Sequence, residues 1–268
     1  MGPHPERARQ DAEALLRHLV GKDKAWLMAH WEEELPDQRA SNYMELIERR
    51  YKGEPIQYIT GEAEFYGLPF RVTPDVLIPR PETEHLVEKV LGLASTLNAP
   101  RIVDVGTGSG AIAVALANHL PHATITAIDL STPALDIARE NAEHNCVAER
   151  INFLEGDLLG PVAGQSFDIV VSNPPYVPQA DRDSLAVEVR DHEPALALFA
   201  GKDGLDVYRR LIPTAFHALV PGGHVALEIG FGQSQAIREL FASAGFNQIE
   251  FVPDLQNIPR VAVARRPS

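Results

Sequence analysis

Four consecutive residues, Asn173-Pro174-Pro175-Tyr176, have the chemistry to hold a planar nitrogen group. The two prolines fix φ and lack a backbone N–H, so the chain takes a stiff direction and leaves carbonyl oxygens free to accept. A target –NH₂ would donate one hydrogen to the Asn173 side-chain oxygen and one to the Pro174 carbonyl, while the Tyr176 ring packs on its plane. These features predict a substrate site for an amide or amidine nitrogen, lined by all four residues.

The nitrogen of an amide or amidine is a poor nucleophile because its lone pair is delocalised. The site must therefore align it with an electrophilic carbon and polarise it through hydrogen-bond acceptors. No strong base is required, because the proton can leave after the transfer. Asn173 is the principal predicted catalytic residue, with Pro174 and Tyr176 beside it. The alternative is that the four residues only interrupt regular secondary structure in a loop. Their position after a predicted strand favours a site.

A glycine-rich loop with the sequence DVGTGSG, residues 104–110, follows one predicted strand and precedes a predicted helix. Glycines permit a tight turn and close approach of a ligand, and the helix N-terminus offers free N–H groups. The spacing differs from the dinucleotide pattern G-x-G-x-x-G. Asp104 would repel a phosphate but attract the α-amino group and sulfonium of S-adenosylmethionine. The loop therefore predicts S-adenosylmethionine as the cofactor, and no metal is expected.

Two further acids end the next two predicted strands. Asp129 lies nineteen positions after Gly110, where an acid that accepts from ribose hydroxyls is expected, and Asp157 would accept from the adenine amino group. Each could instead be an ordinary capping aspartate. The recurrence of an acid at the ends of three successive predicted strands favours the cofactor site. Its predicted residues are Asp104, Gly106, Thr107, Gly108, Ser109, Gly110, Asp129, Leu130, Asp157, Leu158 and Asn173.

The elements that must position these residues alternate between apolar strands and amphipathic helices. The predicted helices include residues 110–119, 133–144 and 205–219, and this alternation indicates an α/β fold with a seven-stranded, mostly parallel, Rossmann-like sheet. Residues 1–54 are predicted to form a small helical domain, 55–76 a β-hairpin linker, and 77–268 the catalytic domain. The seven predicted strands are 102–105, 124–129, 151–154, 169–172, 224–229, 249–252 and 261–264.

The composition is that of an ordinary globular protein, with 45% hydrophobic and 23% charged residues. The formal charge of −13 disfavours nucleic acid as a partner and favours a protein or small-molecule substrate. The sequence has no apolar run of membrane-spanning length and no secretory signal, so a cytoplasmic location with no membrane contact is expected. Its lone cysteine, Cys146, excludes an internal disulfide.

Several segments beyond the Asn-Pro-Pro-Tyr motif are similar to one known family. The most specific is Leu77-Ile-Pro-Arg-Pro-Glu-Thr-Glu84, and the others are 55–61, 193–196, 204–206 and 254–260. Together they resemble the peptide chain release factor glutamine methyltransferases, a family of class I methyltransferases, over residues 10–266. One departure is Asn257, where many relatives would have glycine, but Asn also tolerates a left-handed backbone.

This resemblance implies N(5)-methylation of the glutamine in the Gly-Gly-Gln motif of class 1 release factors. S-adenosylmethionine would become S-adenosylhomocysteine, and the N-terminal helical domain of a monomer would hold the release factor. The resemblance also implies that Arg80, Pro81 and Thr83 close over the site and that Arg80 contacts the substrate. An ion pair between domains is the alternative role for Arg80.

Three other functions are compatible with parts of the sequence. A glutamine methyltransferase for a ribosomal protein would share the Asn-Pro-Pro-Tyr chemistry and differ in its N-terminal domain. An adenine-N6 methyltransferase would need nucleic acid, which the negative charge disfavours. A catalytically inactive cofactor-binding scaffold would have lost Asn173 or the acids, and all of them are present.

Overall fold

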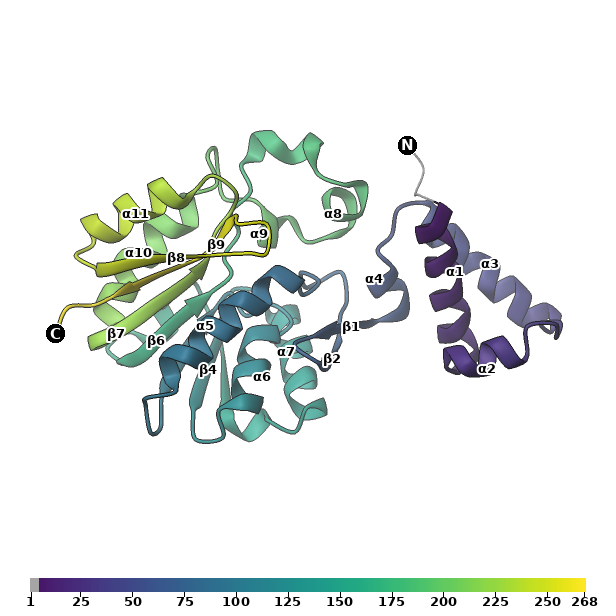
Figure 1. The fold of residues 1–268 in the computed structure, drawn as a ribbon, viewed down its shortest axis with the longest axis horizontal. Coiled ribbons are helices and arrows are strands. Elements are labelled where there is room, and N and C mark those ends of the chain that lie inside the picture. The colour runs from purple at the N-terminus through teal and green to yellow at the C-terminus, as the bar shows by residue number, and fades with distance from the viewer. Residues whose placement is uncertain (1–4) are drawn as a thin grey trace.

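The computed structural model describes residues 5–268, and its N-terminal part is a bundle of three helices. They are α1 (Pro5–Val20), α2 (Lys24–Ala29) and α3 (Asp37–Tyr51). Asp23 caps α2 by accepting from the backbone N–H of Trp26 at 2.7 Å, and Pro36 precedes the first turn of α3. Leu15 is fully buried between the helices. The bundle lies at one end of the molecule, beside the larger body (Figure 1).

A short helix and a hairpin connect the bundle to the body (Figure 1). Helix α4 (Ile56–Thr60) leads into the antiparallel strands β1 (Glu62–Phe65) and β2 (Leu68–Arg71). The turn residues Tyr66 and Gly67 both have positive φ, as a tight two-residue hairpin turn requires. Phe65 and Phe70 pack edge to face and are buried in the core of the body, so the predicted hairpin is confirmed and is fixed to that core.

The body is built on a seven-stranded sheet in the order β5-β4-β3-β6-β7-β9-β8. The first five positions are parallel, whereas β9 is antiparallel to both of its neighbours. The order reverses between β3 and β6, and ligands of such sheets bind at the carboxyl ends of the strands at this switch point. The strands are β3 (Arg101–Val105), β4 (Thr124–Asp129), β5 (Ile151–Glu155), β6 (Phe167–Ser172), β7 (Leu219–Glu228), β8 (Asn247–Pro253) and β9 (Pro259–Arg265).

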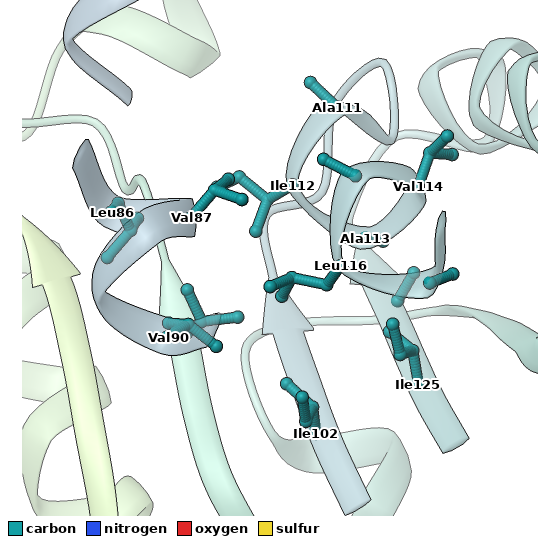
Figure 2. Close-up of a cluster of buried hydrophobic side chains, with 14 of the residues drawn as sticks. Leu86, Val87, Val90, Ile102, Ala111, Ile112, Ala113, Val114, Leu116 and Ile125 are labelled. Carbon is teal, nitrogen blue, oxygen red and sulfur yellow. The ribbon is translucent and has the colours of Figure 1, made fainter. Parts of the chain in front are cut away.

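Helices cover both faces of the sheet. One face packs against α5 (Glu84–Ala94), α6 (Ala111–His119) and α7 (Thr132–His144), and the other against α10 (Asp206–Ala218) and α11 (Ser234–Ser243). The side chains of α5 and α6 meet those of the β-strands in a continuous apolar cluster (Figure 2). Full burial of each large aliphatic side chain there contributes roughly 1.5–3 kcal/mol. The shorter helices are η1 (Pro81–Thr83), η2 (Ala148–Arg150), η3 (Gly160–Val162), η4 (Gln179–Ser184), α8 (Val187–His192) and α9 (Ala195–Leu198).

The predicted fold class is confirmed, with differences at element boundaries. β7 begins at Leu219, five residues before the predicted start, because Leu219 already pairs with Phe167; an irregularity follows, and regular pairing resumes at His224 with Ile169. Asn257 has φ of 62°, so it does adopt the left-handed backbone expected where relatives have glycine. Among the helices of residues 5–268, none is long and apolar enough to span a membrane.

Candidate active site

A cavity of about 260 Å³ opens at the carboxyl ends of β3, β4, β5 and β6. Its walls come from the segment before α5, the glycine loop, the ends of these strands, and residues 194–197. The structure brings most of the predicted site residues together here. They are Arg80, Gly106, Thr107, Gly108, Ser109, Asp129, Leu130, Asp157, Leu158, Asn173 and Pro175. The side chains of Asp104 and Tyr176, together with Gly110 and Pro174, lie outside the cavity wall.

The glycine loop is held against the end of β4. The backbone N–H groups of Gly106 and Thr107 both donate to the Ile128 carbonyl, at 2.8 and 3.0 Å. One carboxylate oxygen of Asp129 accepts from the Gly108 N–H at 2.8 Å, and the other accepts from the Ser131 N–H at 2.9 Å. Asp129 therefore shapes the loop and also presents its carboxylate at the cavity wall, where it was predicted to meet a ribose.

Two glycines of the loop are required for different reasons. Gly108 has φ of +56°, and a Cβ there would meet open space at the cavity wall. Gly110 has φ of +79°, and a Cβ there would lie 3.1 Å from the Cβ of Ala138 in α7. Gly108 thus leaves room for a ligand, whereas Gly110 permits α6 and α7 to pack closely.

Asp104 lies beneath the loop and is fully buried. Its Oδ2 accepts from the Thr107 hydroxyl at 2.6 Å, while its Oδ1 has no hydrogen-bond partner within residues 5–268. Burial raises the pKa of Asp104 to about 7, although the Thr107 hydrogen bond opposes the shift. Direct contact between Asp104 and a cofactor stays a prediction, since the structure shows its carboxylate supporting the loop.

The end of β5 brings Asp157 and Leu158 to the cavity. Asp157 forms an exposed ion pair with Arg210 of α10, which also lines the cavity. Leu158 has φ of 50°, a left-handed conformation that turns the chain sharply after Asp157. Leu130, at the end of β4, is a half-exposed apolar side chain on the same side. These residues line one part of the cavity with apolar side chains and a carboxylate, and their contact with adenine stays a prediction.

Asn173 is anchored by the strand that precedes it and by a neighbouring segment. The Ser172 hydroxyl donates to the Val105 carbonyl at 2.6 Å, which joins the ends of β6 and β3. The side-chain amide of Asn173 donates to the Thr83 hydroxyl at 3.1 Å. Pro174 is buried behind Asn173, and Pro175 lines the cavity.

Tyr176 was predicted to pack on the substrate, and the structure places it just behind the wall. Its ring packs against the apolar core below α10, and its hydroxyl donates to Glu228 at 3.3 Å. Burial raises the pKa of Tyr176, so the phenol stays protonated and remains a donor. Its contact with substrate stays a prediction.

Arg80 forms an ion pair with Glu193 in which Nη2 donates to both carboxylate oxygens, at 2.6 and 2.5 Å. Glu193 is 1% exposed at its side chain, and burial raises its pKa while Arg80 counteracts the rise. The pair joins the segment before α5 to the segment after α8, and Arg80 also lines the cavity. Arg80 therefore does form an ion pair, but within the predicted catalytic domain and not between domains as the alternative supposed, and its substrate contact stays a prediction.

The structure adds Glu228, which the sequence analysis did not select. Glu228 ends β7, is 2% exposed, and accepts from the Thr83 hydroxyl at 2.6 Å. Burial raises its pKa to about 7, against the opposing hydrogen bonds from Thr83 and Tyr176. The sequence did contain a signal for Glu228, because this acid ends an apolar strand. The parallel strands beside it also end in polar residues of the site.

Comparison with known proteins finds methyltransferase relatives along nearly the whole chain. Residues 4–61 match a family model described as PrmC N-terminal domain, and residues 83–190 match one described as Methyltransferase small domain. A release factor glutamine methyltransferase of Koribacter versatilis is 44% identical, over 97% of this chain and 92% of the relative. That of Escherichia coli is 40% identical, over 97% and 93%.

Solved structures share the fold at lower identity. A methyltransferase from Pyrococcus furiosus aligns with a TM-score of 0.56 and 20% identity, over 85% of this chain and all of the other. The hMettl16 catalytic domain aligns with a TM-score of 0.62 and 17% identity, over 87% and 83%. The curated relatives are far more similar in sequence and match nearly end to end. The chain therefore belongs to the release factor glutamine methyltransferase family.

Proposed function

We propose that this protein methylates the side-chain amide nitrogen of the glutamine in the Gly-Gly-Gln motif of class 1 release factors, with S-adenosylmethionine as the donor. One observation carries the chemistry: the –NH₂ of Asn173 is engaged by Thr83, which leaves its carbonyl oxygen to accept from a substrate. Asn173 and the glycine loop line the same cavity, so a glutamine amide held by Asn173 would face the donor. Relatives named for this activity, 44 and 45% identical over 97% of this chain, support the substrate.

The glycine loop and the carboxylates around the cavity fit S-adenosylmethionine. Gly106 and Gly108 leave open space above a loop that only glycine adopts readily, and the Asp129 carboxylate stands at its edge. Asp104 lies under the loop with an unpartnered Oδ1, and its carboxyl, when ionised, favours a cationic ligand over a phosphate. S-adenosylmethionine, when bound, supplies an electrophilic methyl group on a positively charged sulfur.

The residues of the chain hold and orient the substrate amide. Asn173 Oδ1 would accept one hydrogen of the glutamine –NH₂, and the Pro174 carbonyl would accept the other. These two acceptors keep the amide plane fixed and polarise the nitrogen as positive charge develops on it. Asn173 is then the catalytic residue, and Pro174, Pro175 and Tyr176 shape the glutamine slot. The released proton needs no dedicated base in the site.

The three N-terminal helices are the proposed contact surface for the release factor. They project from the body, and the helical part exposes apolar side chains, among them Met28 in α2, Trp31 in the turn after α2, and Met44 in α3. The net charge of −13 favours a protein partner over direct contact with nucleic acid. We expect the protein to act as a monomer in the cytoplasm.

The test is methyl transfer from labelled S-adenosylmethionine to a purified class 1 release factor. A release factor with the Gly-Gly-Gln glutamine changed to alanine is the matched control, and a ribosomal-protein fraction tests the alternative substrate. Label confined to the glutamine of the intact motif is expected. Equal labelling of the glutamine-to-alanine protein, or labelling of ribosomal protein alone, would reject the proposal.

A further inference from the structure

A buried chain of hydrogen bonds connects the predicted catalytic amide to an acid in a distant part of the sequence. Asn173 Nδ2 donates to Thr83 Oγ1 at 3.1 Å, and Thr83 Oγ1 donates to Glu228 Oε2 at 2.6 Å. The second oxygen of Glu228 accepts from the Tyr176 hydroxyl at 3.3 Å. Three segments meet here: η1, the loop after β6, and the end of β7.

The direction of each hydrogen bond follows from the charge on Glu228. An ionised carboxylate can only accept, so Thr83 must use its single hydrogen on Glu228. The Thr83 oxygen can then only accept from its other neighbour, and that neighbour must present the –NH₂ end of Asn173. The Asn173 carbonyl oxygen is thereby left without a partner in the described structure and available to a substrate amide.

A protonated Glu228 would remove this constraint. Its O–H could donate to Thr83, the Thr83 hydroxyl could donate to Asn173 Oδ1, and the amide would turn its –NH₂ toward the cavity. A glutamine –NH₂ would then meet donors instead of an acceptor. The ionisation of one buried carboxyl therefore selects the end of Asn173 that faces the substrate.

The surroundings of Glu228 place both protonation states within reach near neutral pH. Burial raises its pKa to about 7, hydrogen bonds from Thr83 and Tyr176 lower it, and Glu82 and Arg260 act in opposite directions. The Tyr208 hydroxyl donates to the Glu228 backbone carbonyl at 2.7 Å and holds this end of β7 in place. Burial keeps Tyr176 and Tyr208 protonated by raising the pKa of both, so Glu228 is the group of this cluster that changes charge near neutrality.

We propose that Glu228 and Thr83 are positioning residues for methyl transfer: the Glu228 carboxylate orients the Thr83 hydroxyl, which fixes the carbonyl oxygen of Asn173 toward the substrate amide. The inference rests on the proposed function for the identity of that amide. It assigns a role to a residue at the end of β7 that does not line the cavity.

Replacing the middle of the chain tests the connection. Thr83→Val keeps the side-chain shape and removes the hydroxyl, so kcat for release-factor methylation should fall about 10- to 100-fold. Cofactor affinity should be unchanged, and Thr83→Ser should restore kcat. Thr124→Val, at the exposed start of β4, is the control for the same substitution away from the site. An unchanged kcat in Thr83→Val, or no recovery in Thr83→Ser, would overturn the proposal.

The pH profile separates positioning from a merely structural contact. In the wild type, kcat should rise with pH through about 7 as Glu228 ionises. The rise should vanish in Glu228→Gln, which cannot change charge, and also in Thr83→Val, where Glu228 still titrates but is disconnected. Glu250→Gln, which alters the exposed pair with Lys89, should keep the wild-type profile. Persistence of the rise in Thr83→Val would show that Glu228 does not act through Thr83.

A measurement without substrate distinguishes failure of this inference from failure of the proposed function. The side-chain ¹⁵N–¹H₂ signals of Asn173, assigned by their loss in Asn173→Ala, should shift with pH through about 7 in the wild type and stay constant in Thr83→Val. Identical titration in both proteins would overturn the hydrogen-bond chain. If the signals behave as expected but the release factor is not methylated, the chain stands and the proposed substrate is wrong.

Discussion

The side chain of Asn141 donates to the backbone carbonyl of Ser109 at 2.8 Å and so connects helix α7 to the glycine loop. The same amide forms two hydrogen bonds with the backbone of Arg71 in the hairpin, at 2.6 and 2.9 Å. Asn141 is 1% exposed. One buried side chain therefore joins the linker hairpin to the proposed cofactor loop.

Asn141→Ala should lower the free energy of unfolding by about 2–4 kcal/mol, because it leaves buried backbone groups without partners. It should also weaken binding of S-adenosylmethionine, since the loop loses its support. Urea denaturation and calorimetric titration measure the two effects. Asn152→Ala, at an exposed position of β5, is the control. A stable variant with normal cofactor affinity would contradict this role.

Gly108→Ala and Gly110→Ala should separate ligand binding from packing. At Gly110 the new Cβ meets Ala138 at 3.1 Å and φ is positive, so unfolding should become easier by about 1–3 kcal/mol. At Gly108 the Cβ enters open space at the cavity, so the larger effect should be loss of cofactor affinity. Thermal unfolding with and without S-adenosylmethionine measures both variants. Equal effects on stability and affinity in the two variants would contradict the distinction.

Asp104→Asn should change how stability depends on pH. The pKa of Asp104 is raised to about 7 in the folded protein, above its unfolded value, so the folded state binds this proton more tightly. The resulting stability is fully present below about pH 4 and is lost as pH rises through about 7. The free energy of unfolding of the wild type, relative to Asp104→Asn, should therefore fall over that range.

Denaturant unfolding at several pH values measures this difference. Asp168→Asn, near the start of the central strand β6 and partly exposed, is the control for a carboxylate outside the core. Parallel stability curves for wild type and Asp104→Asn would contradict the assignment. Cofactor affinity above about pH 7 should also fall in Asp104→Asn, because the ionised carboxylate that would attract a cationic ligand is gone.

Removing one partner of the ion pair between Arg80 and Glu193 should cost more than removing both charges. Arg80→Met leaves the buried Glu193 carboxylate without its cation and should destabilise the protein by about 3–5 kcal/mol. The double variant Arg80→Met/Glu193→Gln should recover much of this loss. If Arg80 also contacts substrate, KM for the release factor rises in the double variant even though stability returns. Equal stability of the single and double variants would contradict the coupling.

The sheet could be predicted well from the sequence because its strands are apolar and bounded by turns. The helices that follow them have apolar residues at regular helical spacing. Asn173 and the Gly106–Gly110 loop were predictable for a similar reason, since proline and glycine leave local signatures. Local signatures did not separate Gly108, at the cavity, from Gly110, in a helix contact. That difference depends on Ala138, which is distant in the sequence.

Long-range partners account for the other differences between prediction and structure. Nothing near Arg80 indicates Glu193, and nothing near Thr83 indicates Glu228, because the fold brings these pairs together across 113 and 145 positions. Tyr176 has a ring suited to a substrate, yet the packing of β7 and α10 places its hydroxyl on Glu228. The side-chain partners of a buried network depend on tertiary packing that a single sequence does not display.

The central claim is that the carbonyl oxygen of Asn173 orients the glutamine amide for methyl transfer. Its most direct test is a single-turnover measurement with Asn173→Ala, preloaded with S-adenosylmethionine and mixed with excess release factor. The cofactor dissociation constant should stay near the wild-type value, while the rate of methyl transfer should fall by about 100-fold or more. A wild-type transfer rate in Asn173→Ala would contradict the account.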